Sequence, residues 1–263
     1  MTKELCGKTV KSVVAGASPH KFAWLSGDTK DYEKWLGGKK VGKTDYFGGR
    51  VEMEIEDMRL EFADGVNLTL LGKEEKRPAK HQLLIEFTDG TALIAKVQMY
   101  GGLWAHPAGG FMDNEYHAVA HEKVNPLDKA FDEAYFRSLL DSLDQKKLSV
   151  KAFLATEQRI PGLGNGVLQD ILWRAKLHPK RKMASLTDEE VRVLFAVMKE
   201  TLREMAESGG RSTEKDLYGN PGGYKTVMSK ENAAMLCPAC GGGVKKEAYM
   251  GGSVYYCPAC QRM

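Results

Sequence analysis

The chain has 263 residues, of which 43% are hydrophobic and 28% charged, and its formal net charge is +3. This is the composition of a soluble globular protein long enough for one large domain or two ordinary ones. It has no run of 18 apolar residues and no apolar signal core near Met1, so we expect a cytoplasmic protein without a membrane span. The weak positive charge permits a nucleic-acid partner but does not require one.

The first 120 or so residues are predicted to be rich in β-strands. Apolar and polar residues alternate with the period of a half-buried strand, and Asp89-Gly90 is a typical hairpin turn. The expected strands are residues 51–56, 59–62, 66–70, 83–87 and 92–97. Several short strands at this spacing predict a sandwich or barrel, and the polar residues 72–80 are expected to form an exposed loop.

From about residue 125 the apolar period changes to that of a helix. Helices are expected over residues 132–143, after an N-cap at Ser149, over residues 167–176, and from Thr187 to Met205. The predicted fold class is therefore α+β. It comprises a β-rich domain (1–122), a helical domain (123–228) and a C-terminal cysteine-bearing segment (229–263).

Four of the five cysteines form two C-x2-C pairs near the C-terminus: Cys237, Cys240, Cys257 and Cys260. Two such pairs on a short hairpin are typical of a zinc ribbon, in which four thiolates hold one structural zinc ion. The alternative is two disulfides, which is less favoured because nothing else in the chain is typical of a secreted protein. The fifth cysteine, Cys6, is expected to be a small buried hydrophobic residue rather than a reactive thiol.

A glycine-rich turn, Ile160-Pro-Gly-Leu-Gly-Asn165, lies between two of the predicted helices. Glycines before a helix leave backbone N–H groups pointing outward, which suits a phosphate. Asn165 is expected to cap the following helix, and Lys151 lies on the preceding one. The alternative is a plain connection with solvated lysines.

Taken together, the β-rich half, the Gly164-Asn165 turn and the C-x2-C-x16-C-x2-C segment resemble the formamidopyrimidine-DNA glycosylase / endonuclease VIII family. This resemblance implies a DNA repair enzyme that excises oxidised bases and then nicks the backbone. It also implies a helix–two-turns–helix in which Lys151, Gly164 and Asn165 contact DNA phosphates, and a zinc finger at the cysteines. Residues 217–228 would follow the pattern of the loop over the damaged base.

The family's chemistry uses an N-terminal proline amine and a neighbouring glutamate, and the printed chain begins without this pair. No catalytic residue is therefore assigned. Two explanations remain open. One is that the working protein starts upstream of Met1, which is favoured because losing most of a helix would expose apolar surface. The other is that the chain is a divergent member without catalysis.

Other positions also depart from the family pattern. Gly252 stands where the resemblance places a phosphate-gripping arginine of the zinc finger. Met99 and Tyr100 stand where the family inserts side chains into the gap left by a flipped base; they are expected to wedge between bases, or else to pack on the core. Arg50 is aligned loosely with a phosphate-binding lysine.

Three functions follow as hypotheses. The first is a bifunctional glycosylase and AP lyase that binds damaged or abasic duplex DNA as a monomer. The second is a catalytically inactive reader of abasic or bent DNA or RNA on the same scaffold. The third is a zinc-ribbon protein that mainly binds other proteins.

Overall fold

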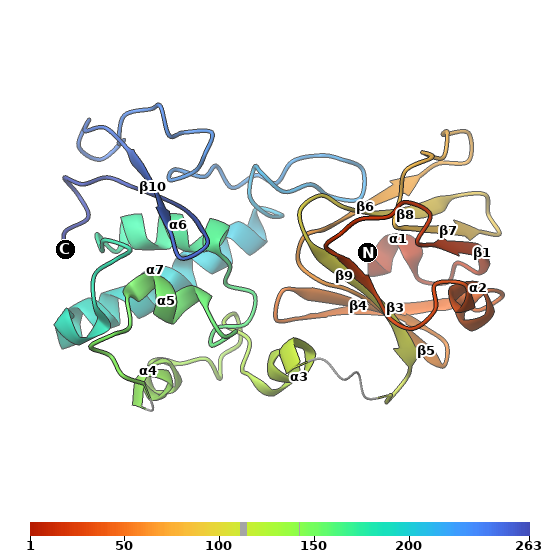
Figure 1. Cartoon of the computed structure of the whole chain (residues 1–263), viewed down its shortest axis with the longest axis horizontal. Helices are drawn as coiled ribbons and strands as arrows, with labels where there is room; N and C mark the ends of the chain where they lie inside the picture. The colour runs from red at the N-terminus through yellow and green to blue at the C-terminus, as the bar shows by residue number, and fades with distance from the viewer. Residues whose placement is uncertain (111–114, 142) are drawn as a thin grey trace. The chain divides into compact units, whose positions relative to one another are not determined.

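A computed structural model of the chain describes residues 1–110, 115–141 and 143–263. Two compact units are present, one of residues 1–118 and 215–220 and one of residues 119–214 and 221–263 (Figure 1). The expected division at residue 122 lies near the first of these boundaries. The helices and the cysteine-bearing segment share one unit, so that segment remains only an expected domain. Among the described helices, none combines the length and apolarity needed to cross a membrane.

The first unit is a sandwich of two β-sheets. One sheet has the strand order β1-β7-β8-β6 and the other has the order β2-β9-β5-β4-β3. Its strands are β1 (Val10–Ala15), β2 (Ala23–Leu25), β3 (Val41–Phe47), β4 (Arg50–Ile55), β5 (Met58–Phe62), β6 (Val66–Leu71), β7 (Leu83–Phe87), β8 (Ala92–Val97) and β9 (Gly101–Pro107). Both sheets contribute to one buried core, which includes Leu60 from one sheet and Ile85 from the other.

All five strands expected from the alternation are present, and the predicted hairpin at Asp89-Gly90 joins β7 to β8. Gly90 has a φ of 86°, which explains the glycine at that turn. Two short helices also belong to this unit, α1 (Thr2–Leu5) and α2 (Asp31–Leu36). The expectation for Cys6 is wrong, because its side chain is exposed at the end of α1.

The second unit is built on helices. They are α3 (Glu115–Glu122), which begins in the first unit, α4 (Glu133–Asp141), α5 (Val150–Ala155), α6 (Asn165–Arg174), the 3₁₀ turn η1 (Met183–Ser185) and α7 (Asp188–Glu207). Ser149 caps α5 as predicted, its hydroxyl accepting from Ala152 N. The apolar faces of α4 to α7 meet in a core that includes Phe136, Phe153 and Leu194.

A capping box begins the longest helix, α7. The Thr187 hydroxyl accepts from Glu190 N, and the Glu190 carboxylate accepts from Thr187 N. We expect Thr187→Ala to lower the free energy of unfolding of this unit by about 1 kcal/mol. Hydrogen exchange at the first turn of α7 would measure the loss. Ser138→Ala, which removes a hydroxyl inside α4, is the matched control, and an equal loss there would contradict the capping role.

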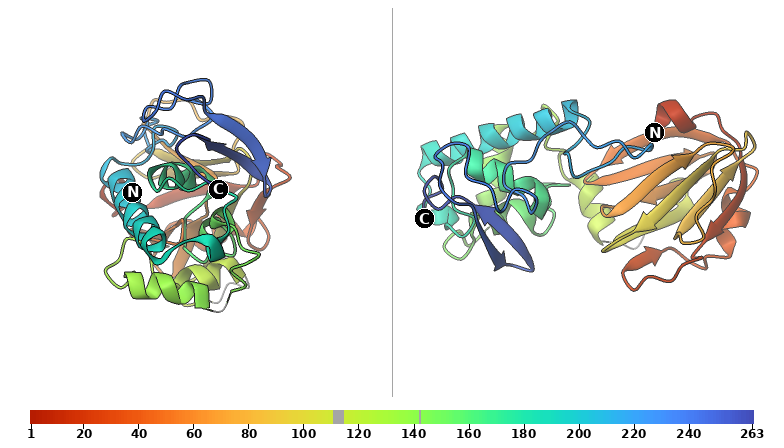
Figure 2. Two further views of the ribbon diagram at one scale, coloured as in Figure 1. Left: turned by 90° about the vertical axis from the view of Figure 1, so that its left-hand side faces the viewer. Right: turned by 90° about the horizontal axis from the view of Figure 1, so that it is seen from above.

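The cysteine-bearing segment contains a hairpin of β10 (Lys245–Tyr249) and β11 (Gly252–Tyr256). The hairpin packs against α6 (Figures 1 and 2). The side-chain amide of Gln169 on α6 bonds to the β11 backbone twice, donating to Ser253 O and accepting from Tyr255 N. The hairpin is thereby fixed to the helix that follows the glycine-rich turn.

Candidate nucleic-acid interface and metal centre

The four paired cysteines converge as their spacing predicts. Their Sγ atoms lie within 4.8 Å of one another, with 3.8 Å between Cys237 and Cys260 and 3.4 Å between Cys240 and Cys257. A tetrahedral zinc site with Zn–S bonds of about 2.3 Å places its sulfurs about 3.8 Å apart. A disulfide needs about 2.05 Å, and in the described part of the chain all five cysteines are free. The cluster therefore fits a tetrahedral metal site and not two disulfides.

The surroundings of Cys237 favour the thiolate that zinc requires. Burial of this thiol opposes ionisation, but the indole N–H of Trp173, 3.4 Å from Cys237 Sγ, and the amides of Ala239 and Cys240 together lower the Cys237 pKa to about 6. A neighbouring amide, Gly242 N, donates to Cys240 Sγ at 3.4 Å. Backbone and indole donors thus stabilise negative charge on Cys237 Sγ.

The glycine-rich turn leads into α6, whose N-cap is Gly164. The prediction that Asn165 caps this helix is wrong, because Asn165 is its first helical residue. Its Nδ2 donates instead to Ser253 O at 2.9 Å, across to the hairpin. Asn165 Oδ1 is buried and has no hydrogen-bond partner among the described residues. Asn165 therefore stands where the turn meets the hairpin tip.

Lys151 reaches the same hairpin tip from α5. The residue is only 3% exposed, and its ammonium donates to Tyr249 O at 2.5 Å and lies 5.6 Å from the centre of the Tyr249 ring. Burial lowers the pKa of this amine. Lys180 lies 5.4 Å from the same ring and pairs with Glu247. In the sequence, Lys180 is one of several basic residues that follow the helix after the glycine-rich turn, and this is its only local signal.

The predicted wedge residues lie in the first unit, between β8 and β9. Met99 is 74% exposed and Tyr100 is 51% exposed, so neither packs in the core. The neighbouring turn after β5 contains Gly65, where a Cβ would come within 2.0 Å of Tyr100 O. Glycine at position 65 thus lets the two turns lie together, with two apolar side chains exposed beside them.

Arg50 is placed differently from a surface phosphate ligand. It is buried, pairs with the fully buried Glu61, and lies 4.7 Å from the centre of the Trp104 ring. His117 Nδ1 also lies 2.7 Å from Glu61 Oε2. Arg50 would have to leave Glu61 before it could bind a phosphate.

A family model described as the formamidopyrimidine-DNA glycosylase H2TH domain matches residues 123–216, which contain α4 to α7. The chain is also 30% identical over 210 residues to the formamidopyrimidine-DNA glycosylase of Streptomyces coelicolor, covering 75% of the chain and 71% of that protein. The chain belongs to the formamidopyrimidine-DNA glycosylase family. Its 33% identity to the Kineococcus radiotolerans glycosylase covers only 53% of that relative. The chain is 26% identical to the Cytobacillus firmus glycosylase, over an alignment that covers 99% of the chain and 95% of that protein.

Solved structures of this glycosylase family share the fold over the whole chain. The Lactococcus lactis Fpg in complex with abasic-site DNA superposes with a TM-score of 0.79 at 22% identity, covering 100% of this chain and 95% of that one. MutM in complex with DNA containing carbocyclic 8-oxo-G gives 0.79 at 24% identity with the same coverage. The two β-sheets, the helices and the cysteine hairpin are therefore the parts of a formamidopyrimidine-DNA glycosylase fold.

Gly252, where the resemblance places a finger arginine, lies close to Asn165. A Cβ at Gly252 would lie 3.2 Å from Asn165 Nδ2, so any larger residue there requires Asn165 to shift. Glycine at this position lets the hairpin backbone approach Asn165 and accept its hydrogen bond. The lack of a side chain at position 252 therefore leaves room for the Asn165–Ser253 contact.

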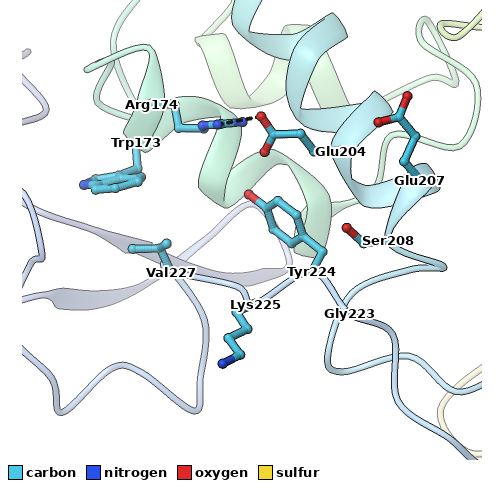
Figure 3. A pocket seen from close by; sticks show the side chains of 9 residues that line it. All are labelled: Trp173, Arg174, Glu204, Glu207, Ser208, Gly223, Tyr224, Lys225 and Val227. Carbon is cyan, nitrogen blue, oxygen red and sulfur yellow. Dashed lines mark hydrogen bonds and ion pairs between the residues drawn. The ribbon is translucent and has the colours of Figure 1, made fainter.

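A hollow of about 520 Å³ in the second unit is lined by side chains of both charges (Figure 3). Arg174 points into it, but its guanidinium is held by Glu204 and Thr201. Glu207 adds a further carboxylate, and Tyr224 has a raised pKa because of burial and the nearby Asp170. Lys225, which is exposed, also lines the hollow, so the hollow combines carboxylates and a phenol of raised pKa with one lysine side chain.

Proposed function

We propose that this protein binds damaged or abasic duplex DNA as a monomer in the cytoplasm and acts in base excision repair. The observation that carries the proposal is the meeting of Lys151, Asn165 and the hairpin tip around Tyr249 and Ser253. These groups come from three separate segments of the chain, two of them predicted to contact phosphate. One structural zinc ion held by the four cysteines is proposed to keep the hairpin in place.

The binding test is an affinity titration with a duplex that contains one abasic-site analogue, repeated at several salt concentrations. We expect log K to fall with log salt by about 0.9 for every phosphate neutralised. A negligible slope, or equal affinity for an uncharged competitor, would contradict DNA binding. That result would favour a zinc-ribbon protein that binds other proteins.

Asn165→Ala is expected to lower the affinity for duplex DNA about tenfold, and equally for all flanking sequences, because a phosphate contact carries no base information. Gln169→Ala is the matched control. Gln169 donates to the same Ser253 O from one turn later in α6, without lying at the glycine-rich turn. An equal loss in both variants would mean that Asn165 acts only by docking the hairpin. A sequence-selective loss would contradict the phosphate role.

The proposed activity is that of a glycosylase and AP lyase for oxidised bases, which proceeds through a Schiff base with the DNA. Borohydride trapping on abasic duplex DNA tests it, using residues 1–263 and a form extended upstream in the reading frame. Trapping by the extended form alone would locate the amine nucleophile upstream of Met1. Binding without trapping by either form would favour the alternative, a non-catalytic reader of abasic or bent nucleic acid.

A further inference from the structure

Three neighbouring strands of the first unit bring together two glutamates and a histidine. Glu52 on β4 lies directly opposite Glu61 on β5, and His106 is on β9, the next strand along. One ligand atom from each of the three side chains lies within 4.8 Å of the others. Like charges directly opposite one another destabilise an antiparallel pair. Two facing carboxylates on adjacent strands are therefore stabilised by positive charge close to them.

The histidine is arranged to supply an electron pair to this cluster. His106 is 9% exposed, and its Nδ1 lies 3.0 Å from Pro107 O. A carbonyl oxygen only accepts, so Nδ1 carries a proton, and in that tautomer of the imidazole the lone pair is on Nε2. Nε2 lies 4.0 Å from Glu52 Oε2 and has no hydrogen-bond partner among the described residues. A buried nitrogen without a partner is costly, and it points at a carboxylate.

Positively charged and titratable side chains already contact the glutamates of this cluster. Arg50 pairs with Glu61, whereas Arg59 is shared at 3.5 Å each between Glu52 and Glu54. Two guanidinium groups therefore face three carboxylates. His117 also contacts the cluster, with its Nδ1 2.7 Å from Glu61 Oε2. Among the described residues, none of these groups forms a hydrogen bond with His106 Nε2.

We propose that Glu52, Glu61 and His106 bind one divalent transition-metal ion, separate from the four-cysteine cluster. One imidazole and two carboxylates suit Zn²⁺ or Mn²⁺, with water in the remaining positions. The Nδ1–H bond to a backbone carbonyl is the support that metal-binding histidines usually have. The ion would join β4, β5 and β9 across the sheet.

Mn²⁺ distinguishes this cluster from the cysteine cluster, because thiolates select softer ions and the cysteines stay loaded with zinc. The full chain, loaded with zinc, is titrated with Mn²⁺, and the loss of the free-ion electron paramagnetic resonance signal gives the stoichiometry. We expect one Mn²⁺ per chain. His106→Gln and Glu52→Gln are each expected to weaken binding at least tenfold. Glu54→Gln, which changes a carboxylate on the same face of β4, is expected to bind as the unaltered chain does.

Zinc content gives a second readout. After equilibration with excess Zn²⁺ and desalting, the unaltered chain should retain one ion more than His106→Gln does, with circular dichroism confirming that both are folded. Equal zinc contents in these two folded proteins would overturn the proposal. It would also be overturned by the absence of stoichiometric Mn²⁺ binding, or by equal losses of binding in Glu54→Gln and Glu52→Gln.

Discussion

Replacement of Cys257 by serine is expected to unfold the β10–β11 hairpin and to lower the affinity for abasic duplex DNA at least tenfold. An isolated two-stranded hairpin is marginally stable in water, so metal binding must supply much of its folding free energy. Cys257 is fully buried and lies within the cysteine cluster. When the hairpin unfolds, Lys151 and Asn165 lose the backbone acceptors that hold them, Tyr249 O and Ser253 O.

Three measurements separate the steps of this prediction. Zinc content should fall by one ion per chain, the Tyr255 amide should lose its protection from exchange, and the DNA affinity should fall with them. Cys6→Ser is the matched control, because Cys6 is exposed and lies outside the cluster. A Cys257→Ser protein that loses its zinc but keeps its DNA affinity would show that the hairpin does not take part in binding.

The elements that the sequence predicts well are those with local signals. Thr187 and Glu190 are three residues apart, and both capping hydrogen bonds form between them. Asp89-Gly90 likewise specifies its own turn. Strand β2 was not predicted because it has only three residues and pairs in parallel with β9, far along the chain. Its existence depends on a partner that no local pattern reveals.

The candidate site likewise has parts that local sequence signals predict and parts that they do not. The cysteine spacing predicts the metal cluster, because each C-x2-C pair is local and the two pairs need only one hairpin to meet. The contacts of Lys151 with Tyr249 and of Asn165 with Ser253 join residues 98 and 88 positions apart. A positive charge at position 151 suggested an exposed phosphate ligand, whereas packing against the hairpin buries it.

The β4–β5 strands show where an alternating pattern misleads. Glutamates at every second position predict a solvated face, yet Glu61 is fully buried, opposite Glu52. A short-range pattern cannot show that Arg50, Trp104 and His117 cover this carboxylate. Breaking this buried network is therefore expected to lower the stability of the first unit substantially.

Glu61→Gln is expected to destabilise the first unit by about 3 kcal/mol, since removing one partner of a buried ion pair leaves the other charge uncompensated. Arg50 would then be buried beside Trp104 without its carboxylate. The chain has two units, so global unfolding is not a single two-state transition. Hydrogen exchange at the β4 and β5 amides, without added metal ions, measures the loss where it occurs. Glu54→Gln is the control, with an expected change of about 0.5 kcal/mol or less.

The double variant Arg50→Met/Glu61→Leu tests how much the Arg50–Glu61 ion pair contributes to the stability of the first unit. Apolar residues of similar volume often replace a buried ion pair at little cost, so we expect this variant to recover most of the stability lost in Glu61→Gln. Recovery of stability together with loss of Mn²⁺ binding would mean that Glu61 serves the proposed ion rather than the fold. A double variant as unstable as Glu61→Gln would contradict the uncompensated charge as the cause. The loss would then come from the contact between Glu61 and His117, which both variants alter.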